Sequence, residues 1–304
     1  MNLFKSSLFV FLGACCYGVL STLVKIAYND GFVFKDVVMS QFLFGWLTML
    51  IIMLISSRRN ITIKQFISLA LIGISTCATT VFYYLSLESI PASFAVVLLF
   101  QFTWIGVLIE SIVDKKFPSK IKILSIIILF IGTILASGVI NSNNFKWSFS
   151  GIIFGLMAAL SYSLFVFFSG RVETQIPSVN RSFCVTTGAL LVAFAICPNY
   201  FSNGCLSQGI WKYGIILGVF GAVLPVLFFA IGTPKLSTGL STILGAGELP
   251  VAIIASIVIL KEEVSMIKWV GVIIILIGVA LPQLVNLKNN NSIKFSKEPN
   301  TNLS

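Results

Sequence analysis

The chain has 304 residues, of which 57% are hydrophobic and only 10% are charged, and its mean hydropathy is +1.02. Soluble globular proteins carry about 25% charged residues, so this composition excludes a soluble globular protein. The net charge is +10, but no basic patch gathers on a folded soluble face, which argues against nucleic-acid binding.

Apolar stretches long enough to cross a bilayer recur along the whole chain. About 20 apolar residues in a helix cross the roughly 30 Å of hydrocarbon. In chain order, we predict ten transmembrane helices: Leu8–Tyr28, Val37–Ile55, Phe66–Leu87, Pro91–Val113, Ile121–Ile140, Gly151–Gly170, Ser182–Cys197, Trp211–Thr233, Leu236–Leu260 and Ile267–Val285. Pro282 is expected to end the tenth helix. Residues 286–304 are polar, and we predict a disordered cytoplasmic tail there.

The chain contains an internal repeat with an offset of 146 residues. Under that shift Ser119–Leu135 falls on Ser265–Leu281, and Lys122 falls on Lys268. Each copy has five predicted helices, and an odd number of crossings requires the second copy to be inverted relative to the first. We therefore predict an all-α integral membrane protein built from two inverted five-helix repeats, residues 6–140 and 151–285. This architecture is typical of secondary transporters.

The distribution of positive charge indicates the orientation in the membrane. With ten spans and a cytoplasmic N-terminus, the inner side carries Lys5, Arg58, Arg59, Lys64, Lys115, Lys116, Lys120, Lys122, Arg171, Arg181, Lys235, Lys288, Lys294 and Lys297. The outer side carries only Lys35, Lys146, Lys212, Lys261 and Lys268. This excess follows the positive-inside rule. We predict a multi-pass protein of the cytoplasmic (inner) membrane with both termini in the cytoplasm.

Ionisable residues inside membrane helices need a reason, because a charge at the helix centre costs about 2.5–3.5 kcal/mol on insertion scales. Glu110 lies one turn from the cytoplasmic end of its predicted helix, and we expect it to pair with Lys115 and Lys116. Lys25 lies near the outer end of the first helix. Its side chain could reach the surface, or it could pair with Glu248.

Glu248 differs from these residues because it lies at the middle of the predicted ninth helix. Gly245 and Gly247 precede it and Pro250 follows it; glycines weaken a helix, and proline removes a backbone hydrogen bond. An acid at a broken helix near the midplane is where secondary transporters build their sites. We interpret Glu248 as a substrate-binding or coupling residue; the structural alternative is a protonated glutamate bonded to neighbouring backbone.

Polar and aromatic residues at similar depth are candidates for lining a binding cavity. We select Gln41, Gln101, Trp104 and Tyr83, because buried amides orient ligands and aromatic rings stack on planar or cationic groups. Each of them could instead fill helix contacts or mark the membrane interface. Further candidates of the same kinds are Tyr17, Trp46, Thr79, Thr80, Tyr84, Tyr162, Thr186 and Ser241.

Several kinds of chemistry have no signature in this sequence. It contains no histidine, no G-x-x-x-x-G-K-[ST] loop and no C-x-x-C pair. We therefore predict no metal site, no cofactor and no enzyme activity. A channel is the alternative outside the transporter class, although no motif of a selectivity filter is present.

Motifs in both halves occur in the order and spacing of a known family. They are Tyr17-Gly18 followed by Lys25, Leu85–Ser93, Gly151–Arg171, Glu248-Leu249-Pro250 followed by Leu260-Lys261-Glu262, and Gly271 with Gly278. Together they resemble the drug/metabolite transporter (DMT) superfamily, specifically the ten-helix EamA-type transporters, over about residues 6–285. The chain departs from the family's pattern at three positions. Gln41 stands where many members have arginine, Trp104 replaces the usual proline of helix four, and Lys116 occupies the position that matches Glu262.

The resemblance implies secondary transport of small organic metabolites by alternating access. We expect export of amino acids or similar amphipathic compounds, with protons as a candidate coupling ion; a uniporter or an exchanger is equally compatible. Within transporters, the alternative is uptake or exchange of a nucleoside-like cofactor such as S-adenosylmethionine. The expected partners are a small-molecule substrate and the lipid bilayer but no nucleic acid, and the protein is expected to be a monomer or a homodimer.

Overall fold

Helices make up all the regular structure of the described residues, which in this computed structural model are 2–56, 60–90, 92–137, 148–260 and 265–295. Within these described ranges, eight segments are long and apolar enough to cross a membrane: Leu3–Asn29, Phe34–Ile55, Ile63–Ser89, Ala95–Asp114, Phe149–Ser169, Ser178–Ile196, Trp211–Lys235 and Thr238–Ile259. A shorter apolar helix covers Met266–Pro282. The chain is an all-helical, multi-pass membrane protein.

The helices of the first half follow the predicted segments but contain two interruptions. They are α1 (Leu3–Gly18), α2 (Leu20–Asn29), α3 (Phe34–Ile55), α4 (Ile63–Ser89), α5 (Ala92–Leu99), α6 (Phe102–Asp114) and α7 (Lys120–Ser137). The first span is interrupted at Val19, between α1 and α2. The fourth is interrupted at Phe100 and Gln101, between α5 and α6, and neither of these residues is a glycine or a proline.

The second half has irregular turns inside two of its spans. Its elements are α8 (Phe149–Ser169), α9 (Ser178–Ile196), α10 (Trp211–Gly218), the π-helical turn η2 (Val219–Val223), α11 (Leu224–Gly232), the 3-10 turn η3 (Thr233–Lys235), α12 (Thr238–Gly245), α13 (Glu248–Leu260) and α14 (Met266–Phe295). The prediction that Pro282 ends the last helix was wrong, because Pro282 lies inside α14. Membrane helices tolerate an internal proline when neighbouring groups satisfy the freed backbone. The predicted tail begins as helix, and residues 296–304 lie outside the described part of the chain.

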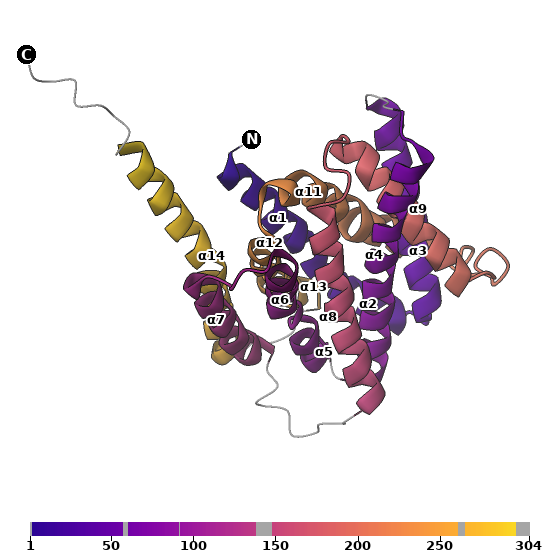
Figure 1. Cartoon of the computed structure of the whole chain (residues 1–304). Coiled ribbons are helices and arrows are strands. Elements are labelled where there is room, and N and C mark those ends of the chain that lie inside the picture. The colour runs from indigo at the N-terminus through magenta and orange to yellow at the C-terminus, as the bar shows by residue number, and fades with distance from the viewer. Residues whose placement is uncertain (1, 57–59, 91, 138–147, 261–264, 296–304) are drawn as a thin grey trace, which may run out of the picture.

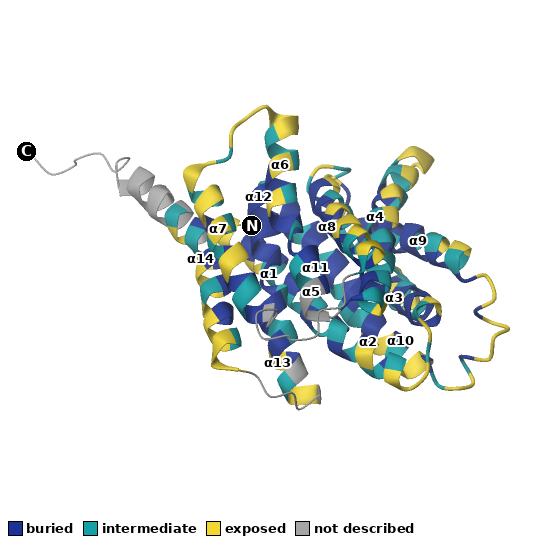
Figure 2. Ribbon diagram, turned by 90° about the horizontal axis from the view of Figure 1, so that it is seen from below, coloured by how far each residue is buried: buried dark blue, intermediate teal, exposed yellow. Residues whose placement is uncertain are grey.

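The two halves interdigitate instead of forming separate bodies. Across the halves, α1 packs on α11 and α13, α3 on α9 and α10, α4 on α8 and α9, α6 on α12, and α7 on α14; Figure 1 shows α7 and α14 side by side at one edge of the molecule. Buried residues gather in the interior of the bundle, and exposed residues lie on its periphery and loops (Figure 2). The interior between the halves is therefore where a site shared by both repeats can form.

Small residues set the closest crossing between the halves. A Cβ atom at Gly73 of α4 would lie 2.1 Å from the carbonyl oxygen of Val185, and one at Gly188 of α9 would lie 2.1 Å from that of Ala70. No side chain fits at such distances from backbone, so both positions require glycine. This is the small-residue contact by which membrane helices approach each other closely.

Candidate substrate cavity

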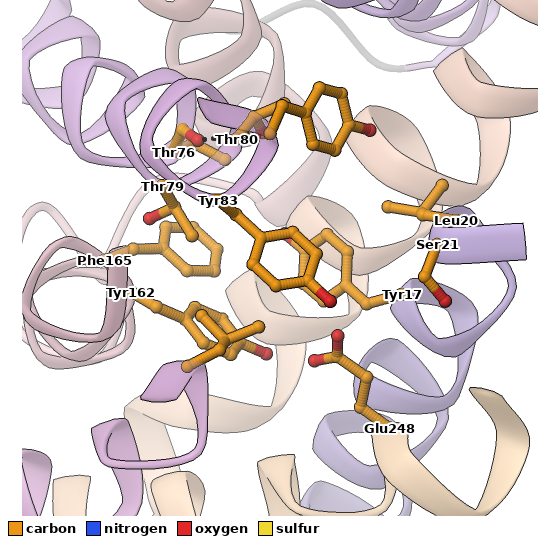
Figure 3. Close-up of a pocket in the computed structure, with 12 residues that line it drawn as sticks. Tyr17, Leu20, Ser21, Thr76, Thr79, Thr80, Tyr83, Tyr162, Phe165 and Glu248 are labelled. Atoms are coloured by element: carbon orange, nitrogen blue, oxygen red, sulfur yellow. Dashed lines mark hydrogen bonds between the residues drawn. The ribbon is translucent and has the colours of Figure 1, made fainter. Parts of the chain in front are cut away.

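A cavity in the interior of the bundle is lined by residues from both halves (Figure 3). Its lining comprises Tyr17, Leu20, Ser21, Thr76, Thr79, Thr80, Tyr83, Tyr84, Leu99, Tyr162, Phe165 and Glu248. The space open to water-sized molecules is about 50 Å³, enough for a few waters at roughly 10–15 Å³ of such space each. An organic ligand therefore requires the surrounding helices to move apart.

Glu248 is the one charged residue of the lining, and it lies at a helix interruption. Here α12 ends at Gly245, a turn covers Ala246 and Gly247, and α13 begins at Glu248. In Figure 3 the carboxylate of Glu248 points into the cavity, toward the hydroxyl groups of Tyr83 and Tyr162. The interruption thus directs the acid at the space between the halves.

The first span packs directly on this interruption. A Cβ atom at Gly247 would lie 2.4 Å from the ring of Phe11, and the Cys15 thiol donates a hydrogen bond to the Gly247 carbonyl oxygen at 3.8 Å. On the next turn, a Cβ atom at Gly18 would lie 2.5 Å from the carbonyl oxygen of Glu248. The position of Glu248 is therefore fixed by backbone contact with α1.

The interruption in the first half lies at the equivalent position. α5 ends at Leu99, and α12 ends at Gly245, 146 positions later. Likewise, α6 begins at Phe102, and α13 begins at Glu248, again 146 positions later. The Ser163 hydroxyl of α8 donates a hydrogen bond to the Phe102 carbonyl oxygen at 3.0 Å. Each repeat thus brings one broken helix to the same cavity.

Aromatic rings form one wall of the cavity. Tyr162 meets Tyr17 edge to face with ring centres 5.6 Å apart, and it stacks on Phe165 at 6.2 Å. On its other side the Phe102 ring lies 4.5 Å away. The Tyr162 hydroxyl is buried and has no hydrogen-bond partner among the described residues. A buried hydroxyl without a partner is costly, so it is a group that a ligand or water would bind.

Of the residues selected from the sequence, Glu248 and Tyr83 line the cavity. Five of the further candidates line it as well: Tyr17, Thr79, Thr80, Tyr84 and Tyr162. Gln41 is fully buried and lies behind the lining, where its Oε1 accepts a hydrogen bond from the Tyr84 hydroxyl at 2.9 Å. Lys25 is exposed on α2 and is not a lining residue. The structure thus brings Tyr83 to the cavity together with Glu248. Gln41 lies outside the lining and contacts the lining residue Tyr84.

Gln101 and Trp104 contact each other instead of the cavity. The Trp104 indole donates a hydrogen bond to Gln101 Oε1 at 2.7 Å, and Gln101 Nε2 donates to the Val97 carbonyl oxygen at 2.9 Å. The Trp104 side chain is 41% exposed and borders a surface groove beside Lys115. This pair supports the interruption between α5 and α6 by satisfying a carbonyl that the helix leaves open.

Sequence reasoning missed five lining residues: Leu20, Ser21, Thr76, Leu99 and Phe165. One signal could have identified Thr76. It lies three, four and seven positions before Thr79, Thr80 and Tyr83, and such spacing places all four on one face of a helix. A stripe of hydroxyl groups along an otherwise apolar span indicates a cavity-facing surface.

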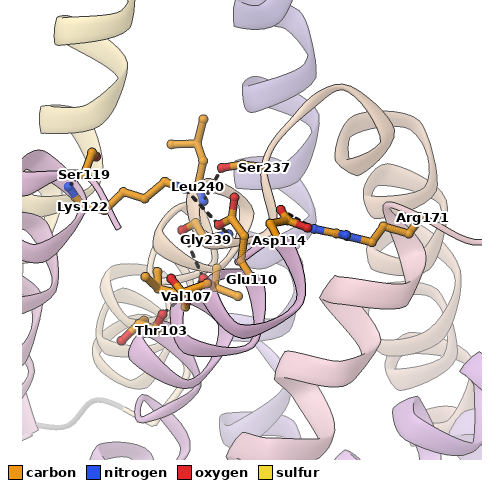
Figure 4. A network of polar contacts seen from close by, with 12 residues as sticks. Thr103, Val107, Glu110, Asp114, Ser119, Lys122, Arg171, Ser237, Gly239 and Leu240 are labelled. Carbon is orange, nitrogen blue, oxygen red and sulfur yellow. Dashed lines mark hydrogen bonds and ion pairs between the residues drawn. The ribbon is translucent and has the colours of Figure 1, made fainter. Parts of the chain in front are cut away.

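A second polar cluster joins the halves where α6 ends and α12 begins (Figure 4). Glu110 of α6 accepts hydrogen bonds from Lys122 Nζ of α7 at 2.9 Å and from the backbone N–H of Gly239 in α12 at 2.6 Å. Nearby, Arg171 binds Asp114 at 2.8 Å, and this hydrogen bond raises the pKa of Arg171. Two carboxylates of α6 therefore fasten the first half to the second.

The expected pairing of Glu110 with Lys115 and Lys116 was wrong. Lys115 adopts a left-handed conformation with φ of 50° and ends α6. The chain therefore leaves the helix axis at that point, and both lysines are exposed. Lys122 instead returns alongside Glu110 on α7. A carboxylate at a helix N-terminus is also favoured by the helix dipole, which explains the contact with α12.

These features define a polytopic membrane protein with a central cavity that both repeats share, the arrangement of a membrane transporter. The model of the EamA-like transporter family matches residues 4–138 and again residues 149–282. The chain belongs to the EamA-like transporter family, within the drug/metabolite transporter superfamily.

Two further comparisons agree with this assignment. The chain is 26% identical over 202 residues to a Bacillus subtilis (strain 168) protein named "Uncharacterized transporter YxxF", a match that covers 66% of this chain and 64% of that protein. A solved crystal structure of another protein superposes with a TM-score of 0.72 over 92% of this chain and 98% of its own, at 15% identity. The second likeness concerns the fold alone.

Proposed function

We propose that this protein is a secondary transporter that exports small organic metabolites, such as amino acids or similar amphipathic compounds, across the cytoplasmic membrane. Transport proceeds by alternating access around the central cavity, with both termini in the cytoplasm. Glu248 binds substrate and couples its movement to protons. The observation that carries the proposal is the pair of helix interruptions at equivalent positions of the two repeats, both at one cavity.

The packing of the helices supports an approximate two-fold relation between the repeats. Under the repeat offset, α1 corresponds to α8, α3 to α9, α6 to α13 and α7 to α14. The same offset relates α4 to α10 and α11. The contact of α4 with α8 is therefore equivalent to the contact of α11 with α1. Likewise, the contact of α4 with α9 is equivalent to the contact of α10 with α3. Two inverted repeats of five spans have this relation, and exchanging their conformations would expose the cavity to opposite sides in turn.

The polar cluster around Glu110 supports a state closed toward the cytoplasm. With a cytoplasmic N-terminus, the ends of α6 and α8 and the start of α12 all lie on the inner side. The cavity residues of α4, Thr76 to Tyr84, lie in the outer half of that helix. Contacts of Glu110 and Asp114 across the halves then act as an inner gate below the cavity.

Removing the gate contacts is expected to open the inner side. A hydrogen bond to a charged group contributes about 1.5–3 kcal/mol, so Glu110→Gln should increase the inward-open population by about tenfold. Lys122→Gln leaves the contact with Gly239 in place and removes only the lysine that holds Glu110 within the first half, so it should give a smaller increase. The readout is maleimide labelling from the cytoplasmic side of a cysteine at Ser241, a buried residue beside the gate. Lys120→Gln, an exposed lysine at the start of the same helix, is the matched control. Equal labelling of all three variants would contradict the gate.

Reconstituted vesicles test the transport function itself. Vesicles loaded with an unlabelled small organic metabolite, either an amino acid or an amine, should accumulate the same labelled compound by saturable counterflow, because a carrier exchanges one bound molecule for another. An acidic vesicle interior should increase net uptake of the substrate, because an exporter coupled to protons exchanges substrate for protons. Single-channel currents, or flux without saturation and counterflow, would instead establish a channel and refute alternating access.

A further inference from the structure

We infer that the cavity recognises the protonated amine of a small organic cation, and that it discriminates against substrates that carry a carboxylate. This inference rests on the proposed transport function and specifies the charge of its substrate. It disfavours both ordinary amino acids and S-adenosylmethionine, the compounds suggested by the sequence, because both carry a carboxylate. It favours amines and other organic cations that lack one. Three independent features of the lining support it.

The first feature is the charge of the lining. Glu248 contributes a carboxylate, and none of the other lining residues is a lysine or an arginine. A substrate carboxylate bound here would face Glu248 without a positive side chain on the cavity wall. A charge in low-dielectric surroundings is strongly destabilised without a counter-ion. An ammonium group would instead be neutralised by Glu248.

The second feature is the direction of the hydroxyl groups. Thr76, Thr79 and Thr80 donate their protons to carbonyl oxygens of their own helix, at 3.2, 2.8 and 3.3 Å. The Tyr84 hydroxyl donates to Gln41 Oε1 at 2.9 Å. These four oxygens therefore have only lone pairs to offer a ligand. This side of the cavity therefore offers acceptors, which suit an ammonium group with three donors and no acceptor and suit a carboxylate poorly. The unpartnered Tyr162 hydroxyl can both donate and accept.

The third feature is the position of the aromatic rings around the acid. Tyr17, Tyr83 and Tyr162 surround the Glu248 carboxylate in Figure 3. Faces of aromatic rings attract cations, with the strongest effect in desolvated sites. The unpartnered Tyr162 hydroxyl, on a side chain only 3% exposed, points into the same space. The site therefore combines a counter-ion, ring faces and a free polar group around one small volume.

Three ligands with the same side chain test the inference: leucine, isoamylamine and isocaproate. Isoamylamine is leucine without its carboxylate, and isocaproate is leucine without its ammonium group. We expect isoamylamine to raise the melting temperature of the purified wild-type protein and to drive counterflow in vesicles, with an affinity at least about tenfold above that of leucine. Isocaproate should give neither effect. Equal or tighter binding of leucine or isocaproate would overturn the inference.

Variants locate the binding site. Glu248→Gln should weaken isoamylamine binding by at least about tenfold, whereas Glu88→Gln, an exposed acid at the end of α4, should leave it unchanged. Tyr162→Leu provides a second test that keeps the acid, and it should also weaken binding. Isoamylamine binding that survives both cavity changes would overturn the assignment. Counterflow of leucine with no preference for the amine would refute this inference and leave the transporter proposal standing, whereas flux of any ligand without counterflow would refute the transporter proposal.

Discussion

Gly18→Ala is expected to destabilise the folded protein and to displace Glu248 at the same time. The new Cβ atom would lie 2.5 Å from the Glu248 carbonyl oxygen, 2.8 Å from Cβ of Val251 and 2.9 Å from the backbone nitrogen of Ala252. Two of these neighbours are backbone atoms, so the clash is relieved only if α1 moves away from α13. Overpacking of this kind costs about 1–3 kcal/mol, and we expect a clearly lower melting temperature together with weaker ligand binding.

Gly13→Ala on the same helix is the matched control. Its Cβ atom would meet ring atoms of Phe229 at 3.1 and 3.2 Å and Cβ of Phe228 at 3.2 Å. A small ring movement of Phe229 and a shift of a few tenths of an ångström at Phe228 relieve these contacts, and no backbone atom is involved. Alanine also favours a helix interior by about 1 kcal/mol over glycine. Thermal unfolding of both variants in detergent separates the cases. If the two alanines have the same effect on stability and binding, the contact between Gly18 and Glu248 does not position the acid.

The two interruptions differ in how much of them the sequence reveals. Gly245, Gly247 and Pro250 mark the break in the second half directly, because each of them weakens a helix. The break at Phe100 and Gln101 has no such residue. It depends on tertiary contacts, such as the hydrogen bond from Ser163 to the Phe102 carbonyl oxygen. Only the repeat offset could have indicated it from the sequence.

The contacts of the two candidate acids, Glu248 and Glu110, likewise could not be predicted from the sequence. The location of Glu248 within a span was readable from hydropathy alone, but its proximity to Tyr162 depends on the packing of α8 against α12, the helix that ends just before Glu248. Glu110 was assigned to the lysines nearest in sequence, whereas its contact with Gly239 is 129 positions away. Composition and periodicity therefore predicted the apolar helical segments and the presence of both acids within them, while the partners of these acids were set by how the two repeats pack.

Glu248→Gln is expected to reduce the rate of proton-driven transport by about a hundredfold. That factor corresponds to about 2.7 kcal/mol, which lies within the usual contribution of a hydrogen bond to a charged group. The change keeps the size of the side chain and removes both its negative charge and its ability to exchange a proton. Flux of labelled isoamylamine into vesicles, driven by a pH gradient, measures the loss. Glu248→Asp should retain part of the activity, because a carboxylate remains at the start of α13.

Counterflow without a pH gradient separates the two roles proposed for this acid. If Glu248 both binds the cation and carries the proton, Glu248→Gln loses counterflow and proton-driven flux together. If it carries the proton alone, counterflow persists at the wild-type rate while the response to the pH gradient disappears. Among the described residues, the cavity wall has no acid other than Glu248. Wild-type behaviour in both assays would therefore mean that neither binding nor coupling uses the cavity, and the transport path would have to lie elsewhere in the bundle.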